Sequence, residues 1–466
     1  MRFILCILTL FHGLVTVPLV AQGVSVKEFG AVGDGKQDDS AAIQKAVNAH
    51  GSVVFPKGVY RIEKSIKVSL DKTGYSSLTG DGSATILMAG EGAAFYFSGT
   101  HEGSADPKQF KPQVWEKERM PVVRGLEIKG LHDKANGIEA NGVMQLVISE
   151  VRIQHVHHAV HLVQRNRNVI ISNCHFYENR GVGVFFDHVN LHQFNMTGTH
   201  ISYNAEGGVV LRGGEVRNVH IGTCDIESNM TPDGPVTANV LIDCTGGSTA
   251  EVAITGCTIQ HNSKSKDSVN VWLKGKGVTS AKNAAATQEG HMTITGNIFS
   301  DVSVNVLLQH ARGVTITGNT FWEGFEHDLL VEDSQAVVVG PNDFDRNPRY
   351  VVNGNWAKDK NGIVFRRSQD CKLNGVLVKG VGGKEAAVLL EECHRFTVMD
   401  CSILDCDGVG LWLADCTQSM VSHCMIRDDR EAAKATHSIK VTGGEGVSLH
   451  GNHVSHGVSN ESGGKD

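Results

Sequence analysis

The stretch that decides the fold is Val169-Ile170-Ile171-Ser172-Asn173-Cys174-His175-Phe176. Its first, third, sixth and eighth positions are apolar, and small or polar residues fill the turn between the two alternating pairs. Alternation with period two is typical of half-buried β-strands, so the stretch predicts two very short strands joined by a tight turn. Strands this short cannot bury a face on their own, and we therefore expect the pattern to recur.

The pattern begins at twelve places: Leu146, Val169, Phe194, Val219, Val252, Met292, Val314, Val337, Cys371, Phe396, Ser419 and Val447. Most starts are separated by about 22–25 residues, and the longer intervals indicate insertions. Many starts follow another alternating apolar pair, such as Val388 and Leu390, by about six residues. Two or three short strands per unit make one coil of a solenoid, so the sequence predicts an all-β parallel β-helix of about 12 coils.

Most repeats carry Cys or Asn at the shared turn position: Cys174, Cys224, Cys257, Asn297, Asn319, Asn342, Cys401, Cys424 and Asn452. Stacked like on like, Asn side chains form a hydrogen-bonded ladder, and buried thiols pack as small hydrophobic groups. Zinc sites need closely spaced Cys pairs with nearby His, a pattern that these positions do not have. The sequence therefore predicts structural stacks and no metal centre at the Cys residues.

Composition and charge narrow the class of protein. The 466 residues are 41% hydrophobic and 20% charged, as in globular proteins, and the net charge of -7 argues against a nucleic-acid partner. Residues 1–21 combine a basic start with an apolar run, which predicts a secretory signal and a secreted or periplasmic protein. No later stretch has the ~20 apolar residues that a membrane span needs, so we expect none.

The segment after this signal predicts a cap for the solenoid. Asp38 or Asp39 can begin a helix whose apolar stripe includes Ile43 and Val47 and which ends at Gly51. Residues 53–60, Val-Val-Phe-Pro-Lys-Gly-Val-Tyr, then return to β-structure. A helix over the first coil would cover an otherwise open sheet edge.

This opening, Phe-Gly-Ala-Val-Gly-Asp-Gly-Lys-Gln-Asp-Asp-Ser at residues 29–40 and the strand after the helix, resembles the pectate-lyase-like β-helix superfamily. That superfamily includes polygalacturonases, rhamnogalacturonases, epimerase-like proteins and phage tailspikes. The resemblance implies a right-handed β-helix acting on polysaccharide. We expect residues 22–62 to form the cap and first strands, 63–458 the β-helix and 459–466 a polar tail.

The resemblance also indicates where to search for a site, because functional residues of the polygalacturonase-like group lie in the turn before a strand. Counted in the same way, the densest titratable segment runs from Asp133 to Glu206. The catalytic candidates are His157, His158, Glu178, Arg180, Tyr203 and Glu206. The substrate-binding candidates are Asp133, Arg165, Arg167, Asp187, His188 and Arg212.

These residue types suit an acidic polysaccharide. Arg would neutralise a uronate carboxylate, His or Arg would remove the C5 proton, and Tyr203 would protonate the leaving oxygen, which is β-elimination. Hydrolysis is the alternative, with Glu178 and Glu206 as the better carboxyl pair because they lie one coil apart. The Asp-Asp and Gly-His-Gly motifs of polygalacturonases have no matching set here, although Asp428 and Asp429 are adjacent.

The sequence thus favours an exported enzyme that cleaves a polysaccharide, with a non-catalytic carbohydrate-binding or adhesive solenoid as the rival. Calcium is the one cofactor that the resemblance allows, and no segment has an EF-hand spacing. A charged insertion, residues 101–120 with Trp115, predicts a loop off the early coils, which either walls a substrate groove or is an ordinary surface excursion. A second insertion, residues 264–290, is rich in Lys, Ala, Ser and Gly and predicts a flexible loop.

Overall fold

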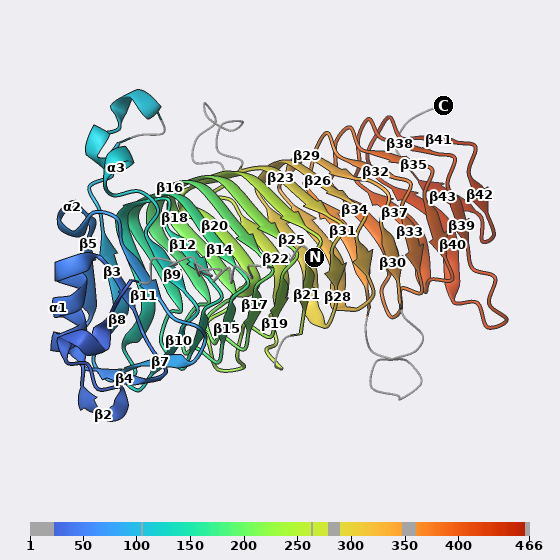
Figure 1. Cartoon of the computed structure of the whole chain (residues 1–466). Helices are drawn as coiled ribbons and strands as arrows, with labels where there is room; N and C mark the ends of the chain where they lie inside the picture. The colour runs from blue at the N-terminus through green and yellow to red at the C-terminus, as the bar shows by residue number, and fades with distance from the viewer. Residues whose placement is uncertain (1–22, 104–105, 262–263, 278–288, 347–359, 462–466) are drawn as a thin grey trace, which may run out of the picture.

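The computed structural model describes residues 23–103, 106–261, 264–277, 289–346 and 360–461, so the predicted signal segment lies outside the described residues. The described strands stack into a long solenoid whose coils run from the N-terminal end to the C-terminal end (Figure 1). Each coil has three faces. In one coil, β13 (Arg152–Gln154) forms face 3, and β14 (Val160–Ser172) follows face 1, bends between Val163 and Arg165 and continues along face 2.

Faces 1 and 2 belong to one continuous sheet in the described part of the chain. Face 1 contains β5 (Ile66–Ser69), β8 (Gly92–Ser98), β11 (Ala135–Met144), β14, β16 (Val184–Thr197), β18 (Val209–Gly222), β20 (Ala238–Thr255), β22 (Val269–Lys274), β25 (Val302–Gln309), β28 (Gly324–Glu332), β31 (Gly362–Arg366), β34 (Ala386–Glu391), β37 (Gly408–Ala414), β40 (Ala435–Thr442) and β43 (Val458–Glu461). Face 2 contains the second halves of β14, β16, β18 and β20, with β1 (Val24–Ser25), β3 (Ser52–Val54), β6 (Ser77–Thr79), β9 (Val122–Arg124), β12 (Val147–Ser149), β23 (Glu289–Thr295), β26 (Ala311–Thr317), β29 (Gln335–Val339), β32 (Lys372–Asn374), β35 (Thr397–Met399), β38 (Met420–Ser422) and β41 (Ser448–His450).

Face 3 is a separate parallel sheet, which has 16 strands among the described residues. Its strands are β2 (Asp34–Asp38), β4 (Gly58–Ile62), β7 (Ala84–Met88), β10 (Glu127–Gly130), β13, β15 (His175–Tyr177), β17 (His200–Ser202), β19 (Asp225–Glu227), β21 (Thr258–Gln260), β24 (Ile298–Phe299), β27 (Thr320–Phe321), β30 (Asp343–Asp345), β33 (Leu377–Lys379), β36 (Ser402–Leu404), β39 (Met425–Arg427) and β42 (His453–Val454). Each of the twelve predicted repeats ends in one of the strands from β13 onward. The predicted number of about 12 coils was too low, because the coils of β2, β4, β7 and β10 lack the repeated turn residue.

Parallel pairing in register places equivalent residues of successive coils directly above one another. Ile171 of β14 pairs with Met196 of β16, which pairs with Ile221 of β18, and all three side chains are buried inside the solenoid. The apolar positions of residues 169–176 face the core, as predicted. The side chains of Val169, Ile171, Cys174 and Phe176 are all 0% exposed. One apolar core therefore runs the length of the molecule.

The N-terminal coil is covered by α1 (Ser40–His50), as predicted, and Figure 1 shows this helix across the blue end of the solenoid. Its side chains Ile43 and Val47 are buried, and Gly51 ends the helix. Asp38 accepts a hydrogen bond from the Ser40 backbone N–H at 3.0 Å, whereas Asp39 points back to hold the Val32 N–H at 2.7 Å. The remaining described helices are short: η1 (Val26–Phe29), α2 (Leu70–Thr73), η2 (Pro107–Gln109) and α3 (Pro112–Glu116).

Two buried ladders of side-chain amides follow the solenoid axis. The predicted ladder is present, because Asn297 donates to Asn319 at 3.0 Å and Asn319 donates to Asn342 at 2.9 Å. A second, longer ladder was not predicted. In it, each side-chain Nδ2 donates to the Oδ1 of the next residue at 2.7–2.9 Å. Its members, in order, are Asn179, Asn204, Asn229, Asn239, Asn270, Asn305 and Asp328. The amide dipoles of this ladder all point their N–H ends towards the Asp328 carboxyl group, which is 1% exposed.

The ten cysteines that the structure describes are buried, as predicted, and none of these ten forms a disulfide. The thiols of Cys174 and Cys224 donate to backbone carbonyls of their own turns. Burial raises the pKa of Cys174 to about 12, so its sulfur stays protonated and unreactive at neutral pH. The ten described cysteines therefore act as small core residues.

The predictions of two loops are wrong in part, because both segments contain regular secondary structure. Residues 101–120 contain η2 and α3, and Glu118 anchors this insertion by accepting hydrogen bonds from the N–H and hydroxyl of Thr100, each at 2.7 Å. The stretch 264–290 contains β22, which pairs with β20 and carries Trp272. Its Lys and Gly content hid a strand, and only residues 278–288 of it lie outside the described residues.

We predict that the longer amide ladder sets the stability of the central coils. The Asn204→Ala change removes the acceptor that Asn179 Nδ2 reaches at 2.7 Å and one of the donors to Asn229 Oδ1. Each buried partner lost in this way costs about 1–3 kcal/mol. The unfolding midpoint in urea should therefore fall. The control is Asn195→Ala, at an exposed strand position, which should change stability by less than about 0.5 kcal/mol. Equal midpoints for the two variants would contradict this role.

Candidate functional site

The outer side of face 1 carries two rows of side chains, one residue per coil. The first row contains Glu139, His161, Phe185 and Val210, which are in register on successive strands. The second row lies two residues further along each strand and contains Asn141, Val163, Asp187, Arg212 and Asp243. Strands lie about 4.8 Å apart, so neighbouring members of a row are within reach of one ligand.

His161 is held between two carboxylates from the coils on either side. Its Nδ1 lies 3.1 Å from Glu139 Oε2, and its Nε2 lies 3.1 Å from Asp187 Oδ2. Burial lowers the pKa of His161, but the hydrogen bonds to Glu139 and Asp187 outweigh it, and the net shift is upward. His161 is therefore an imidazolium clamp that fixes both carboxylates.

Asp187 also holds His188, whose Nδ1 lies 2.7 Å from Asp187 Oδ1. Burial raises the pKa of Asp187, but the hydrogen bonds from His188 and His161 lower it by more. The net shift is downward, so the carboxylate stays ionised. The side chain of His188 is 65% exposed, which leaves its Nε2 open to solvent. A histidine oriented by a carboxylate in this way is suited to proton transfer.

His157 and His158 form the neighbouring rim of the same face. Their ring centroids are 3.9 Å apart, and His158 also packs against Phe185 at 4.9 Å. Burial lowers the pKa of His158 to about 3, with the charges of His157 and His161 adding to the effect, and its Nδ1 accepts the Val182 N–H at 3.0 Å. Burial also lowers the pKa of His157, whose side chain is 39% exposed, so a neutral imidazole faces solvent here.

Arg212 completes this patch. Its guanidinium carbon lies 5.6 Å from the ring centroid of Phe185, and the side chain is exposed. Among the described residues, Arg212 makes no hydrogen bond or ion pair. The next carboxylate of the row, Asp243, is instead held by Thr245 at 2.6 Å and by Lys274 at 3.6 Å. Arg212 is thus a cation available to an anionic ligand.

Apolar side chains continue the first row beyond this charged patch. Val210, Leu241 and Leu307 are buried on the outer side of face 1 in a cluster separate from the main core. Trp272 lies in the same row and is partly exposed, and it borders a hollow of about 340 Å³ together with His327. Insertions flank the face on both rims: residues 99–121 join face 1 to face 2, and residues 229–237 join face 3 to face 1. We call the outer side of face 1 between these two insertions the face 1 groove.

The other candidates from the sequence lie at the rims. Glu178 pairs with His155 at 3.0 Å, Tyr203 is 53% exposed, and Glu206 Oε2 lies 3.9 Å from His157 Nε2. The guanidinium of Arg180 donates to the His132 carbonyl at 2.6 Å and lies 3.7 Å from the carboxylate of Asp133. The structure thus brings His157 and Glu206 together and engages Arg180 in fixing a turn.

Arg165 and Arg167 lie away from the groove floor, beneath the insertion of residues 101–120. Arg165 donates to the Gly103 carbonyl, and the guanidinium of Arg167 stacks over the ring of Phe110 at 4.9 Å. Burial lowers the pKa of both guanidinium groups. In this position they hold the insertion against the solenoid.

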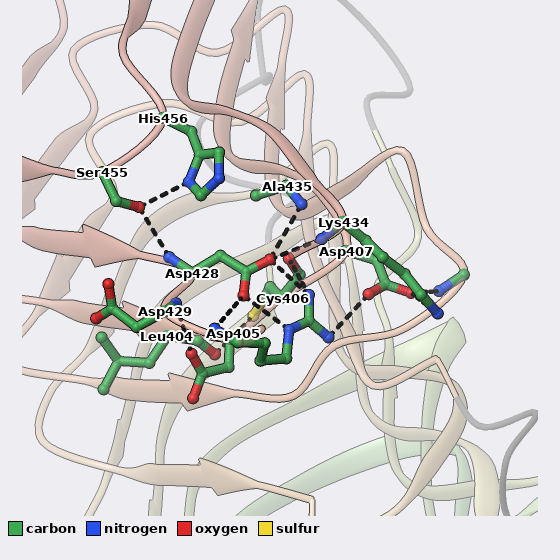
Figure 2. A network of polar contacts seen from close by, with 12 residues as sticks. Leu404, Asp405, Cys406, Asp407, Asp428, Asp429, Lys434, Ala435, Ser455 and His456 are labelled. Atoms are coloured by element: carbon green, nitrogen blue, oxygen red, sulfur yellow. Dashed lines mark hydrogen bonds and ion pairs between the residues drawn. The ribbon is translucent and has the colours of Figure 1, made fainter. Parts of the chain in front are cut away.

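The adjacent carboxylates near the C-terminal end have a structural role (Figure 2). Asp428 is 5% exposed and accepts from Arg430 at 2.7 Å and from the backbone N–H groups of residues 434 and 435. Arg430 also reaches Asp407 at 3.0 Å. The hydrogen bond from Arg430 is the main cause of a pKa of Asp428 far below its usual range. This network closes a turn and occupies the carboxylate of Asp428, while the neighbouring Asp429 pairs with Arg427 at 2.7 Å.

No group of three or more His, Cys, Asp or Glu in the described part of the chain is arranged to hold a metal ion. Within that part, no helix is both long and apolar enough to cross a bilayer. The calcium hypothesis stays a prediction.

Three family models match successive parts of the chain. Residues 23–120 match "Rhamnogalacturonase A/epimerase, pectate lyase-like", and residues 116–259 match "Right handed beta helix region". The chain is a right-handed parallel β-helix protein whose N-terminal part, residues 23–120, is similar to the pectate-lyase-like family. Residues 224–428 of this β-helix also match "Periplasmic copper-binding protein (NosD)".

Individual relatives are distant. The pre-neck appendage protein of Bacillus phage B103 is 50% identical over 46 residues, which cover 10% of this β-helix and 5% of the phage protein. Gene product 12 of bacteriophage phi29 shares the fold with a TM-score of 0.51 at 12% identity, covering 94% of this chain and 56% of that one. The A-module of the mannuronan C-5 epimerase AlgE4 of Azotobacter vinelandii gives a TM-score of 0.41 at 14% identity, covering 94% and 96%.

Sequence reasoning missed Glu139 and placed His161 outside the candidate set. Both could have been found from register, because Glu139 and His161 are 22 residues apart, one coil length, and directly paired. Asp187 and His188 were among the substrate-binding candidates from the sequence. The structure joins all four into one network.

We predict that Asp187→Asn lowers the pKa of His161, because the substitution removes one of its two anionic partners. In the wild-type chain the His161 ring signals should titrate above the ordinary value of ~6.5, measured by NMR. Because the folded pKa is raised, the ion pairs stabilise the fold fully below the unfolded pKa and lose that effect as the pH rises through the folded value. A His161 titration that is identical in both proteins would exclude the clamp.

Proposed function

We propose that this β-helix is an exported enzyme that cleaves a uronate-containing polysaccharide by β-elimination in the face 1 groove. The observation that carries the proposal is Arg212, an exposed cation one coil from the Asp187 and His188 pair. Among the described residues, its guanidinium stacks on Phe185 but has no hydrogen-bond or ion-pair partner. A carboxylate of an acidic sugar is the natural partner of such a guanidinium. The apolar row beyond it, with Trp272, suits the faces of sugar rings.

The chemistry assigns each group a separate task. Arg212 binds the uronate carboxylate and withdraws charge, which lowers the cost of removing the C5 proton. His157, kept neutral by burial, accepts that proton. The C5–H electrons form the C4–C5 double bond, the C4–O bond breaks, and the leaving oxygen takes a proton from water, while Nε2 of His188 binds the glycosidic oxygen of the next sugar.

Asp187 and Glu139 support these steps without touching the sugar. Asp187 fixes the ring of His188 through Nδ1. Glu139 and Asp187 together fix His161, which packs against the ring of Phe185 beneath Arg212 with ring centroids 5.5 Å apart. The network therefore preorganises the floor on which the sugar would lie.

We predict the following kinetics on polygalacturonate or alginate, with reducing ends and unsaturated-uronate absorbance followed together. The His157→Ala change should lower kcat by about 10²–10⁴, because a general base is lost. The Arg212→Ala change should lower kcat/KM by about 10–100-fold, the value of a charged hydrogen bond of about 1.5–3 kcal/mol.

Arg124→Ala is the matched control, since Arg124 is an exposed arginine on face 2 whose ion-pair partner is Glu150. It should retain wild-type activity. Reducing ends without unsaturated product would replace elimination by hydrolysis. Binding without either product would make the protein a non-catalytic carbohydrate-binding solenoid and overturn the enzyme proposal.

A further inference from the structure

A second hollow lies on face 2, away from the groove of face 1. It has a volume of about 450 Å³ and is bordered by Asn168, Ile170, Gln193, Asn195, Asn218 and His220. These residues come from the second halves of β14, β16 and β18, three successive coils. Volumes of ~300–1,000 Å³ are typical of small-ligand sites. We call this hollow the amide trough.

The side chains of the amide trough have unused hydrogen-bonding capacity. Among the described residues, no hydrogen bond is made by the side chains of Asn168, Gln193, Asn195 or His220. The Oδ1 atom of Asn168 is shielded from solvent and still has no partner within that part of the chain. By contrast, Asn166 in the same strand donates to the Ala140 carbonyl at 2.9 Å and accepts from the Val143 N–H at 3.2 Å.

This contrast is informative because the amides of the longer ladder are paired with one another. Every amide of the longer ladder donates a hydrogen bond from its Nδ2 to the side chain of the next ladder residue. Asn218 donates to Glu251 at 2.6 Å. The side chains of Asn168, Gln193 and Asn195 neither form a ladder nor pair with neighbours among the described residues, so they retain donors and acceptors for a ligand. Ile170, 41% exposed, lies among them and provides an apolar surface.

The nearby cations do not turn the amide trough into an anion site. Arg217 already donates to the Ser248 carbonyl at 2.9 Å and to the Val216 carbonyl at 2.8 Å. Burial, with the charges of Arg167 and Arg217, lowers the pKa of His192, which is therefore neutral at neutral pH. The ligand should be uncharged where it contacts the trough, rich in hydroxyl groups and apolar on one side.

We propose that the amide trough is a saccharide-binding site, separate from the face 1 groove, that holds a glycan chain by its hydroxyl groups and packs one sugar face on Ile170. The trough spans two coil steps, about 10 Å along the solenoid axis. This site binds glycan whether or not the groove on face 1 is catalytic.

The test is affinity electrophoresis in gels that contain galactan, β-glucan, arabinan or polygalacturonate. The variant is Asn195→Ala/His220→Ala, since both residues are exposed and neither has a positive φ. The matched control is Thr293→Ala/Thr315→Ala, two positions of the same row further along face 2. The host should lack N-glycosylation, because Asn195-Met196-Thr197 is an acceptor sequence.

The wild-type chain and the control should be retarded by at least one of these glycans, and the variant should lose about tenfold or more in affinity for it. Arg212→Ala should keep this retardation, which separates the trough from the groove. Failure of any glycan to retard the wild-type chain, or equal retardation of variant and control, would overturn the proposal.

Discussion

Parallel pairing in register is the interaction on which the rest of the structure depends. Because each coil lies directly above the one before it, equivalent side chains of successive coils are in contact. Each position must therefore carry a residue that packs against, or hydrogen-bonds to, the equivalent residue of the next coil. Inside, this gives the column of Ile171, Met196 and Ile221 and the amide ladder that ends at Asp328. On the outer side, it gives rows in which neighbouring side chains are about 4.8 Å apart, so one polymeric ligand can contact several members of a row.

The amide ladders and the outer rows are two uses of the same geometry. Within the solenoid, an Asn side chain satisfies its neighbour, and a change of register would leave several buried amides unpaired at once. On the outer side, the rows contain unlike residues, so His161 can be held by Glu139 from one coil and Asp187 from another. The proposed site lies where a row stops repeating, as at Arg212.

The sequence predicted the elements that repeat and missed those that depart from the repeat. Val169 to Phe176 identified the coil, and Ile43 and Val47 identified the cap, since both patterns are local. Trp272 was assigned to a loop because its strand lies in a segment of insertion-like composition. Glu139 was missed because its coil lacks the turn residue used for counting. Insertions change the coil length, so counting a fixed number of residues from the turn does not show which side chains face the groove. Arg180 holds a turn, whereas Arg212 faces the groove, and both were candidates from the sequence.

The most direct test of the central claim is a crystal structure of the His157→Ala chain with a bound oligouronate. The account predicts a ligand that lies along face 1, with a carboxylate bonded to the guanidinium of Arg212 and a glycosidic oxygen within hydrogen-bond reach of His188. An oligouronate bound only elsewhere, with the face between Glu139 and Asp243 left open, would contradict it.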